Sequence, residues 1–113
     1  MDDFFDNWTV QVRKGLLELC ILNALDRRER YAYDLVKTLA AVPSLGVTEG
    51  TIYPLLSRLR LAGMVATRLV ESSAGPARKY YNLTPRGREA MGMMNAYLDR
   101  MNRDADELRQ GGD

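Results

Sequence analysis

Apolar residues repeat at helical spacing along the first forty residues. A first helical segment is predicted by apolar residues spaced four apart: Phe4, Trp8 and Val12. Between Leu16 and Leu25 nearly every position is apolar, which predicts a central helix that is buried on all sides. A charged turn at 26–30 follows. A second, amphipathic helix is then indicated by Tyr33, Val36, Leu39 and Ala40, and the Pro- and Gly-containing stretch at 43–46 ends it.

A third helix is predicted between Thr48, a residue type that often caps a helix N-terminus, and Gly63, which ends the helix. Its core face follows the full helical spacing: Ile52, Leu55, Leu56 and Leu59. The residues pointing away from this face include small and polar types: Gly50, Pro54, Ser57 and Leu61. Pro54 cannot bond the carbonyl of Gly50, so a simple kink in a packing helix is an alternative interpretation of this residue.

Two β-prone runs follow, Met64–Glu71 and Arg78–Leu83, and they flank a turn of small residues at 72–77. This pattern predicts a β-hairpin. Alternation along the second strand places Arg78 and Tyr80 on one face, and Lys79, Tyr81 and Leu83 on the other. At least one of the two tyrosines is expected in the core. Thr84 and Pro85 then open a last helix as the N-cap and first helical residue.

The predicted order of elements is helix, helix, helix, hairpin, helix. This order favours a mainly α fold with a small β-hairpin, a winged helix-turn-helix followed by a C-terminal dimerisation helix. We expect the winged helix-turn-helix domain, with its N-terminal helix, to span residues 1–83. The dimerisation helix is expected at 84–109, and residues 110–113 are expected to form a disordered tail.

Apolar residues of the last helix recur at alternating spacings of three and four, the pattern of a coiled-coil seam. The stripe on the first helical segment provides a second layer. A homodimer interface is therefore predicted at Phe4, Trp8, Val12, Met91, Met94, Leu98, Met101 and Leu108. The alternative is a last helix that packs only on its own domain.

Charge is unevenly distributed. Residues 48–88 contain seven Lys/Arg and two Asp/Glu, a net charge of +5, whereas residues 1–47 and 89–113 carry −1 and −3. A basic middle segment suits contact with a polyanion. The outward face and flanks of the third helix, together with the base of the hairpin tip, then give the DNA-binding candidates: Thr48, Thr51, Tyr53, Ser57, Arg58, Arg78 and Lys79.

Composition argues against an enzyme. The 113-residue chain has no histidine and one cysteine, Cys20, which lies in an apolar run. Catalytic arrangements that need a histidine cannot be built, and we expect no catalytic residue, metal or cofactor. The acidic start of the chain is unlike a signal peptide, so a cytoplasmic location is expected. A winged-helix protein-interaction module without DNA binding is the alternative function, although such a module has no need of the basic middle segment.

Two long motifs, Gly50–Leu59 and Gly75–Gly87, together with the shorter Gly15–Leu19 and Tyr31–Leu35, resemble the recognition helix, wing and flanking helices of the PadR family of bacterial transcription regulators. The resemblance covers nearly the whole chain, and the short length is similar to the compact subgroup with a single C-terminal helix. It implies a dimeric regulator, usually a repressor, that occupies a palindromic operator and is sometimes released by a small aromatic effector.

Carried over by position, the resemblance supports Thr51, Tyr53 and Arg58 as DNA contacts on the third helix, and Arg78 and Lys79 as contacts on the wing. The sequence departs from the family pattern at Ala32, where glycine is frequent, and at Arg60, where an acidic residue is common. An effector pocket would involve Trp8, Met94 and Tyr97. The alternative is that the methionines only fill the core.

Overall fold

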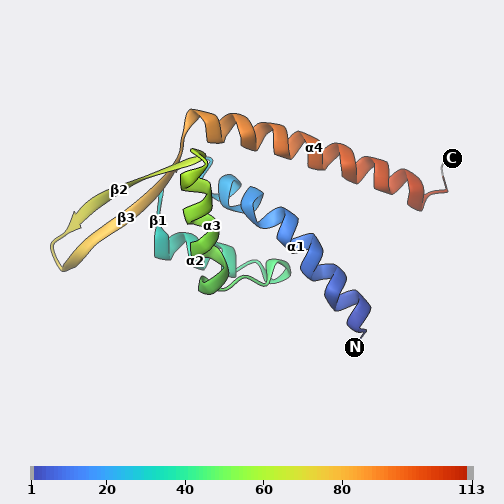
Figure 1. Ribbon diagram of the computed structural model, residues 1–113, viewed down its shortest axis with the longest axis horizontal. Coiled ribbons are helices and arrows are strands. Elements are labelled where there is room, and N and C mark those ends of the chain that lie inside the picture. Colours follow the sequence, from blue (N-terminus) through green and yellow to red (C-terminus); the bar gives the residue numbers. More distant parts are fainter. Residues whose placement is uncertain (1, 112–113) are drawn as a thin grey trace.

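The chain folds into helices around a small sheet, and the computed structural model describes residues 2–111. The two apolar stretches at the start form one continuous helix (Figure 1). In chain order the elements are α1 (Asp3–Ala24), β1 (Arg30–Tyr31), α2 (Ala32–Ala40), the 3-10 turn η1 (Pro43–Leu45), α3 (Glu49–Leu61), β2 (Val65–Ser72), β3 (Gly75–Leu83) and α4 (Pro85–Arg109). The predicted order of three helices, a hairpin and a last helix is confirmed.

The core lies where the C-terminal half of α1 meets α2, α3 and the base of the sheet. Five side chains in it are completely inaccessible to solvent: Ile21, Leu22, Leu35, Ile52 and Leu56. Val65 of β2 and Tyr81 of β3 close the core from the sheet side. Burying these aliphatic side chains stabilises the fold by about 1.5–3 kcal/mol each.

Two details of the helix predictions were wrong. The stretch Leu16–Leu25 is not buried on all sides, because Leu16 and Cys20 are only half-buried. In α2 the buried face consists of Leu35, Val36 and Leu39, whereas Tyr33 and Ala40 are exposed. The helix starts at Ala32, directly after a strand, and this rotates Leu35 rather than Tyr33 toward the core.

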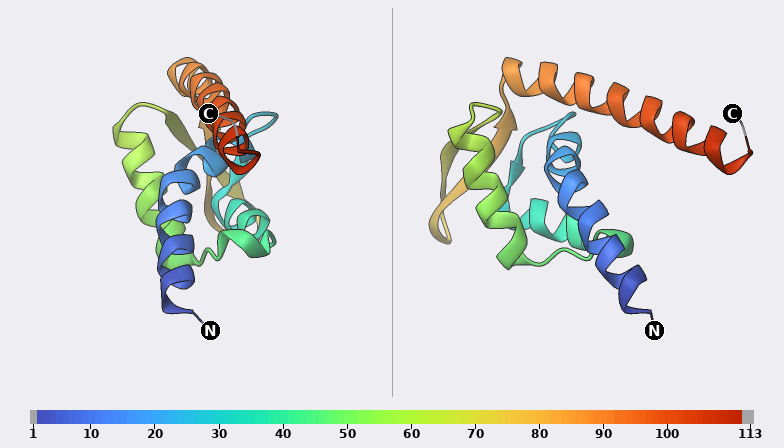
Figure 2. Two further views of the ribbon diagram at one scale, coloured as in Figure 1. Left: turned by 90° about the vertical axis from the view of Figure 1, so that its right-hand side faces the viewer. Right: turned by 45° about the vertical axis from the view of Figure 1, so that its right-hand side comes forward.

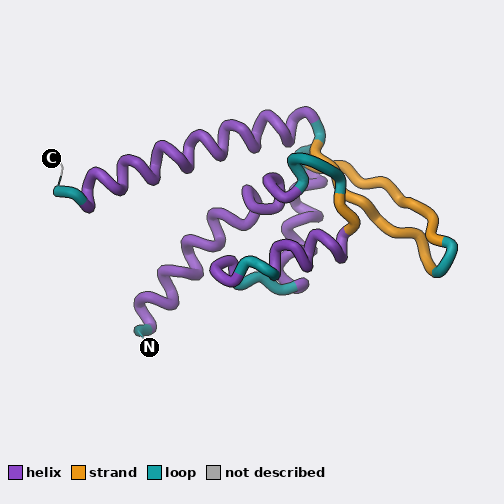
Figure 3. Tube along the Cα trace, turned by 180° about the vertical axis from the view of Figure 1, so that it is seen from behind, coloured by secondary structure: helices purple, strands orange, loops and turns teal. Residues whose placement is uncertain are grey.

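The sheet has three antiparallel strands in the order β1-β3-β2, one more than predicted. Arg30 and Tyr31 of β1 pair with Tyr81 and Tyr80 of β3, which ties the hairpin to the helical body. Strand β2 is shifted by one residue from the prediction and β3 starts three residues earlier, which leaves a turn of only two residues, 73–74, at the tip. They project beyond the body as the orange tube in Figure 3.

Two local backbone features define where α3 ends and where α4 begins. Gly63 follows α3 with φ +80°, and its N–H donates to the Arg60 carbonyl while the Met64 N–H donates to the Leu59 carbonyl, so a Schellman motif ends α3 as predicted. The Thr84 hydroxyl accepts a hydrogen bond from the Gly87 N–H at 2.9 Å, which confirms it as the N-cap of α4.

The end of α4 differs from the expected tail. Gln110 and Gly111 form a turn that closes the helix, with the Gln110 N–H donating to the Asp106 carbonyl at 3.1 Å. Residues 112–113 of the predicted tail lie outside the described residues. Helices α1 and α4 diverge from the body like the arms of a V (Figure 2). Within residues 2–111, no helix is long and apolar enough to cross a membrane.

Candidate nucleic-acid interface

Helix α3 presents a polar outward face beside the hairpin. Ile52, Leu56 and Leu59 are buried in the core, whereas Thr51 and Ser57 are exposed on the other side. Tyr53 retains 39% of its surface. The helix continues through Pro54 from Glu49 to Leu61, so the proline does not break it. This exposed surface can enter a groove without displacing any core residue.

The start of α3 carries two hydroxyl groups. The side-chain oxygens of Thr48 and Thr51 lie 3.3 Å apart, and both residues are exposed. Thr48 occupies the N-cap position, but its hydroxyl makes no capping hydrogen bond, so the expected side-chain cap was wrong. Its carbonyl instead accepts the N–H groups of Thr51 and Ile52. A helix start without a side-chain cap is suited to binding an anion such as a phosphate.

Arg58 and Arg60 leave α3 on different flanks. The Arg58 guanidinium donates to the Glu18 carboxylate of α1 at 3.0 Å, so a phosphate has to compete with Glu18 for this side chain. Arg60 is on the sheet side. Burial raises the pKa of the Tyr81 phenol, and the positive charge of nearby Arg60 opposes this shift.

The wing is the hairpin of β2 and β3. Tyr81 is buried with 6% exposure and Tyr80 is half-buried, so Tyr81 is the tyrosine that belongs to the core. Arg78 pairs in register with Val70, and Lys79 with Leu69. Alternation places Arg78 on the Tyr80 face and Lys79 on the Tyr81 face. The two cations are both exposed and leave the strand in opposite directions.

Ion pairs reduce the free positive charge of the middle segment. Three of its arginines pair with carboxylates of residues 18–29, outside the segment: Arg58 with Glu18, Arg68 with Glu29, and Arg88 with Asp26. In the part of the chain that the structure describes, Arg60, Arg78, Lys79 and Arg86 have no ion pair. The +5 of residues 48–88 therefore overstates what is available to a polyanion, and the unpaired cations are concentrated around the wing and the end of α3.

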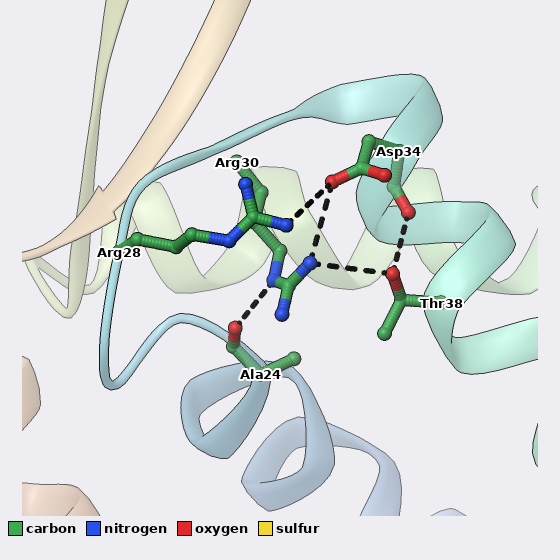
Figure 4. A network of polar contacts seen from close by, with 5 residues as sticks. All are labelled: Ala24, Arg28, Arg30, Asp34 and Thr38. Carbon is green, nitrogen blue, oxygen red and sulfur yellow. Dashed lines mark hydrogen bonds and ion pairs between the residues drawn. The ribbon is translucent and has the colours of Figure 1, made fainter.

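A polar network fixes α2 against the end of α1 (Figure 4). The Arg30 side chain donates to the Ala24 carbonyl at 2.7 Å and to the Asp34 carboxylate at 3.3 Å. It also lies 3.4 Å from the Thr38 hydroxyl, and Arg28 pairs with the same carboxylate at 3.7 Å. Arg30 satisfies a carbonyl at the C-terminus of α1 while it orients α2, so the position of the helix-turn-helix follows that of α1.

Sequence reasoning gave no functional role to Tyr31, whose ring contacts Arg78 of the wing. Tyr31 belongs to a strand of two residues, which is too short to produce a recognisable alternation. A weak signal was present, because residues 30–33 read Arg-Tyr-Ala-Tyr with aromatic residues at every second position.

An apolar groove separates α1 from α4. It has a volume of about 710 Å³, and it brings together Trp8, Met94 and Tyr97, the three residues expected in an effector pocket. Val12, Leu98 and Met101 of the predicted dimer interface also line it. Phe4 and Leu108 lie beyond the groove and are 80% and 77% exposed. Met91, also predicted at the dimer interface, is 8% exposed and packs in the chain's own core.

Other chemistry finds little support. Cys20 is half-buried, and burial raises the pKa of its thiol, which disfavours the reactive thiolate. Over residues 2–111, the structure contains no cluster of side chains suited to hold a metal ion.

Helix α3 follows α2 and precedes a two-stranded wing, and unpaired cations lie beside α3 and the wing. This arrangement defines a winged helix-turn-helix protein of the DNA-binding class. The sequence pattern of the transcriptional regulator PadR-like family matches residues 21–93. The chain therefore belongs to the PadR-like family, whose members are DNA-binding regulators and not enzymes.

Solved structures of regulators agree with this assignment. A PadR-like transcription factor from Bacteroides fragilis is 39% identical, with a TM-score of 0.76 over 90% of this chain and 98% of its own. A PadR-like regulator from Bacillus cereus is 36% identical, with a TM-score of 0.79 over 88% and 97%. A PadR-family regulator from Eggerthella lenta is 29% identical, with a TM-score of 0.83 over 95% and 93%. No curated protein matches the chain.

Proposed function

We propose that this regulator is a repressor that binds a pseudo-palindromic operator as a homodimer. Each α3 enters a major groove, with Thr51 and Tyr53 near base edges, while Thr48 and Ser57 lie at the groove wall. Arg58, Arg78 and Lys79 contact phosphates. The proposal rests chiefly on the exposed polar face of α3, which lies beside a wing that carries Arg78 and Lys79, two cations without an ion pair in the described residues.

The shape of the single chain supports a dimer. Its accessible surface is 8094 Å², whereas a compact monomer of 12.8 kDa is expected to expose about 6,300 Å². Its radius of gyration is 16.6 Å, against about 13 Å for a compact domain of this length. The excess arises because α1 and α4 diverge and expose their facing sides.

Large exposed apolar residues concentrate on these two arms. Trp8 is 56% exposed, Tyr97 58%, Met93 67% and Met101 52%. All of α4 from residue 99 onward is exposed, and an isolated helical arm of this kind is marginal in water. We propose that α4 of a second copy lies in the α1–α4 groove and covers Trp8, Val12, Met94, Leu98 and Met101, with Phe4 and Leu108 at the periphery.

The same groove is the proposed effector site. A small planar aromatic compound would contact Trp8, Met94 and Tyr97, and its binding would alter how the α4 arms pack. Because α1 is tied to α2 through Arg30 and to α3 through the Glu18–Arg58 pair, a shift of the arms changes the distance between the two reading helices. Saturable quenching of Trp8 fluorescence, together with weaker operator binding, is the expected response. Flat titrations across a broad panel of planar aromatics would contradict an effector role for the groove.

The experiment that tests the DNA-binding proposal begins with selection of bound fragments from the source genome. Fluorescence anisotropy on a selected fragment and on random duplex then gives the specific-to-nonspecific ratio. In Tyr53→Ala, the difference in binding free energy between specific and nonspecific DNA should shrink by on the order of 1–3 kcal/mol for each interaction with a base edge that the substitution removes. Val10→Ala, at an exposed position of α1 that does not line the groove, is the control. If no fragment is enriched and no salt-dependent DNA binding is found, the protein-interaction alternative replaces this proposal.

A further inference from the structure

The three strands place a set of aromatic and cationic side chains on one face of the sheet. Tyr31 of β1 pairs in register with Tyr80 of β3, which pairs with Arg68 of β2. Arg78 lies two residues before Tyr80 on the same strand and therefore shares this face. It is the diagonal neighbour of Tyr31 across the strand pair, close enough for long side chains to meet.

Ring contacts connect these side chains. The Arg78 guanidinium carbon lies 4.9 Å from the centre of the Tyr31 ring. The Tyr31 ring is in turn 5.9 Å from that of Tyr80 and 6.1 Å from that of Tyr33. Arg68 stacks on Tyr80 at 5.6 Å. Tyr31 is thus held between two other rings, which leaves it little freedom to turn away from Arg78.

Arg78 differs from the other cations in this area. Arg68 is held by a two-fold hydrogen-bonded pair with Glu29, which neutralises its charge. Within residues 2–111, the Arg78 side chain makes no hydrogen bond and no ion pair, and contacts only the ring of Tyr31. Its charge is therefore oriented but not neutralised. Lys79, on the opposite face, has no aromatic partner within the same described range.

A shallow hollow adjoins Arg78. It has a volume of about 360 Å³ and lies between the wing tip and the start of α2, and the residues that line it include Tyr31, Ala32, Gly75, Arg78 and Lys79. Among the described residues no carboxylate lines the hollow, so a phosphate group can approach the Arg78 guanidinium there without meeting a negative charge from them.

We propose that Tyr31 is a positioning residue for DNA binding, whose ring holds the Arg78 guanidinium toward the hollow beneath the wing, where it meets a backbone phosphate. This inference rests on the proposed function. A long arginine side chain on an isolated wing otherwise loses rotamer freedom when it binds a phosphate, and contact with Tyr31 removes part of that loss before DNA arrives.

The test compares two substitutions of Tyr31, one of them in two backgrounds, on a selected operator fragment across a salt series. Tyr31→Phe retains the ring, Tyr31→Leu retains apolar bulk without the ring face, and Tyr31→Leu is also made in an Arg78→Ala background. Because each dimer has two wings, Tyr31→Leu should weaken operator binding about 5- to 30-fold, whereas Tyr31→Phe should bind like wild type. Arg78→Ala alone should reduce the salt slope by about two per dimer.

A double-mutant comparison separates positioning from a merely structural role. In the Arg78→Ala background, Tyr31→Leu should cause no further loss of affinity, because the side chain that it positions is already absent. Further weakening there, or an unchanged affinity for Tyr31→Leu in the wild-type background, overturns the inference. An unchanged affinity for Arg78→Ala overturns it as well. If wild type itself does not bind DNA, the proposed function fails rather than this inference alone.

A second measurement needs no substitution and so does not depend on the variants folding. Nitrogen-15 relaxation of the arginine Nε groups in the free protein should show Arg78 more ordered than Arg60, which has neither a stacking ring nor an ion pair in the described residues. Equal disorder of the two side chains contradicts pre-positioning by Tyr31.

Discussion

Met101→Asp is the substitution that should separate the two copies of the proposed dimer most cleanly. Met94 and Leu98 are half-buried against the chain's own core, so changing them also affects the monomer. Met101 lines the groove but is 52% exposed in the single chain, where an aspartate finds water. The variant should therefore fold as a monomer and lose only the interface.

The magnitude follows from the exposed half of the methionine. Full burial of a methionine side chain contributes about 1.5–3 kcal/mol, so covering half of it contributes about 1 kcal/mol per chain and about 2 kcal/mol per dimer. Leaving two unpaired carboxylates in the closed seam costs several kcal/mol more. The combined change of about 4 kcal/mol or more corresponds to a dimer weakened about a thousandfold or more.

Sedimentation equilibrium measures this change directly. Ala96→Asp is the matched control, because Ala96 is exposed on the opposite side of α4 and does not line the groove, so it adds the same charge away from the seam. Wild type and Ala96→Asp should be dimers at micromolar concentration, and Met101→Asp should be a monomer with an unchanged circular dichroism spectrum. A Met101→Asp variant that dimerises as well as wild type would refute the assignment of this groove to the partner.

Two further predictions concern stability. In Gly87→Ala, the new methyl would lie 1.9 Å from the Met64 carbonyl oxygen, a backbone atom, so the free energy of unfolding in urea should fall by about 3 kcal/mol or more. Gly92→Ala on the same helix has open space, and its free energy of unfolding should rise by up to about 1 kcal/mol. Equal effects of the two substitutions would contradict the close packing at Gly87. Burial raises the pKa of Tyr81 in the folded protein, so the phenol ionises more easily in the unfolded chain. The contribution of the buried phenol to stability is therefore complete below about pH 10, and it is lost as the pH rises through the higher folded pKa. Tyr81→Phe should flatten the fall in urea stability above pH 10, and an unchanged slope would show that another group causes it.

Much of the fold could be predicted from local signals. The apolar spacing of α3, the Gly63 stop and the Thr84–Pro85 start are each determined by contacts within a few residues, and all three are confirmed. The spacing of α4 identified a helix with an apolar stripe. The spacing could not show which part of that stripe is covered by the chain itself, and Met91 at the start of the stripe is buried in the chain's own core.

The remaining features depend on contacts between distant residues. Strand β1 exists only because β3 lies beside it, and two residues carry no periodic signal of their own. The pairing of Arg58 with Glu18 joins residues forty positions apart, so the sequence could suggest a free arginine but not its ion pair. Likewise, the stacking of Arg78 on Tyr31 follows from the register of β1 and β3, which sequence spacing does not supply.

Hydroxyl-radical footprinting on an operator fragment selected from the source genome tests the central claim most directly. A dimer that places each α3 in a major groove should protect two tracts related by a dyad, with their centres about one helical turn, or roughly 10 bp, apart. Ala96→Asp should reproduce this pattern, and Met101→Asp should lose it at the same concentration. A single unsymmetrical tract, or an intact two-tract footprint from Met101→Asp, would contradict the account of a dimeric operator-binding regulator.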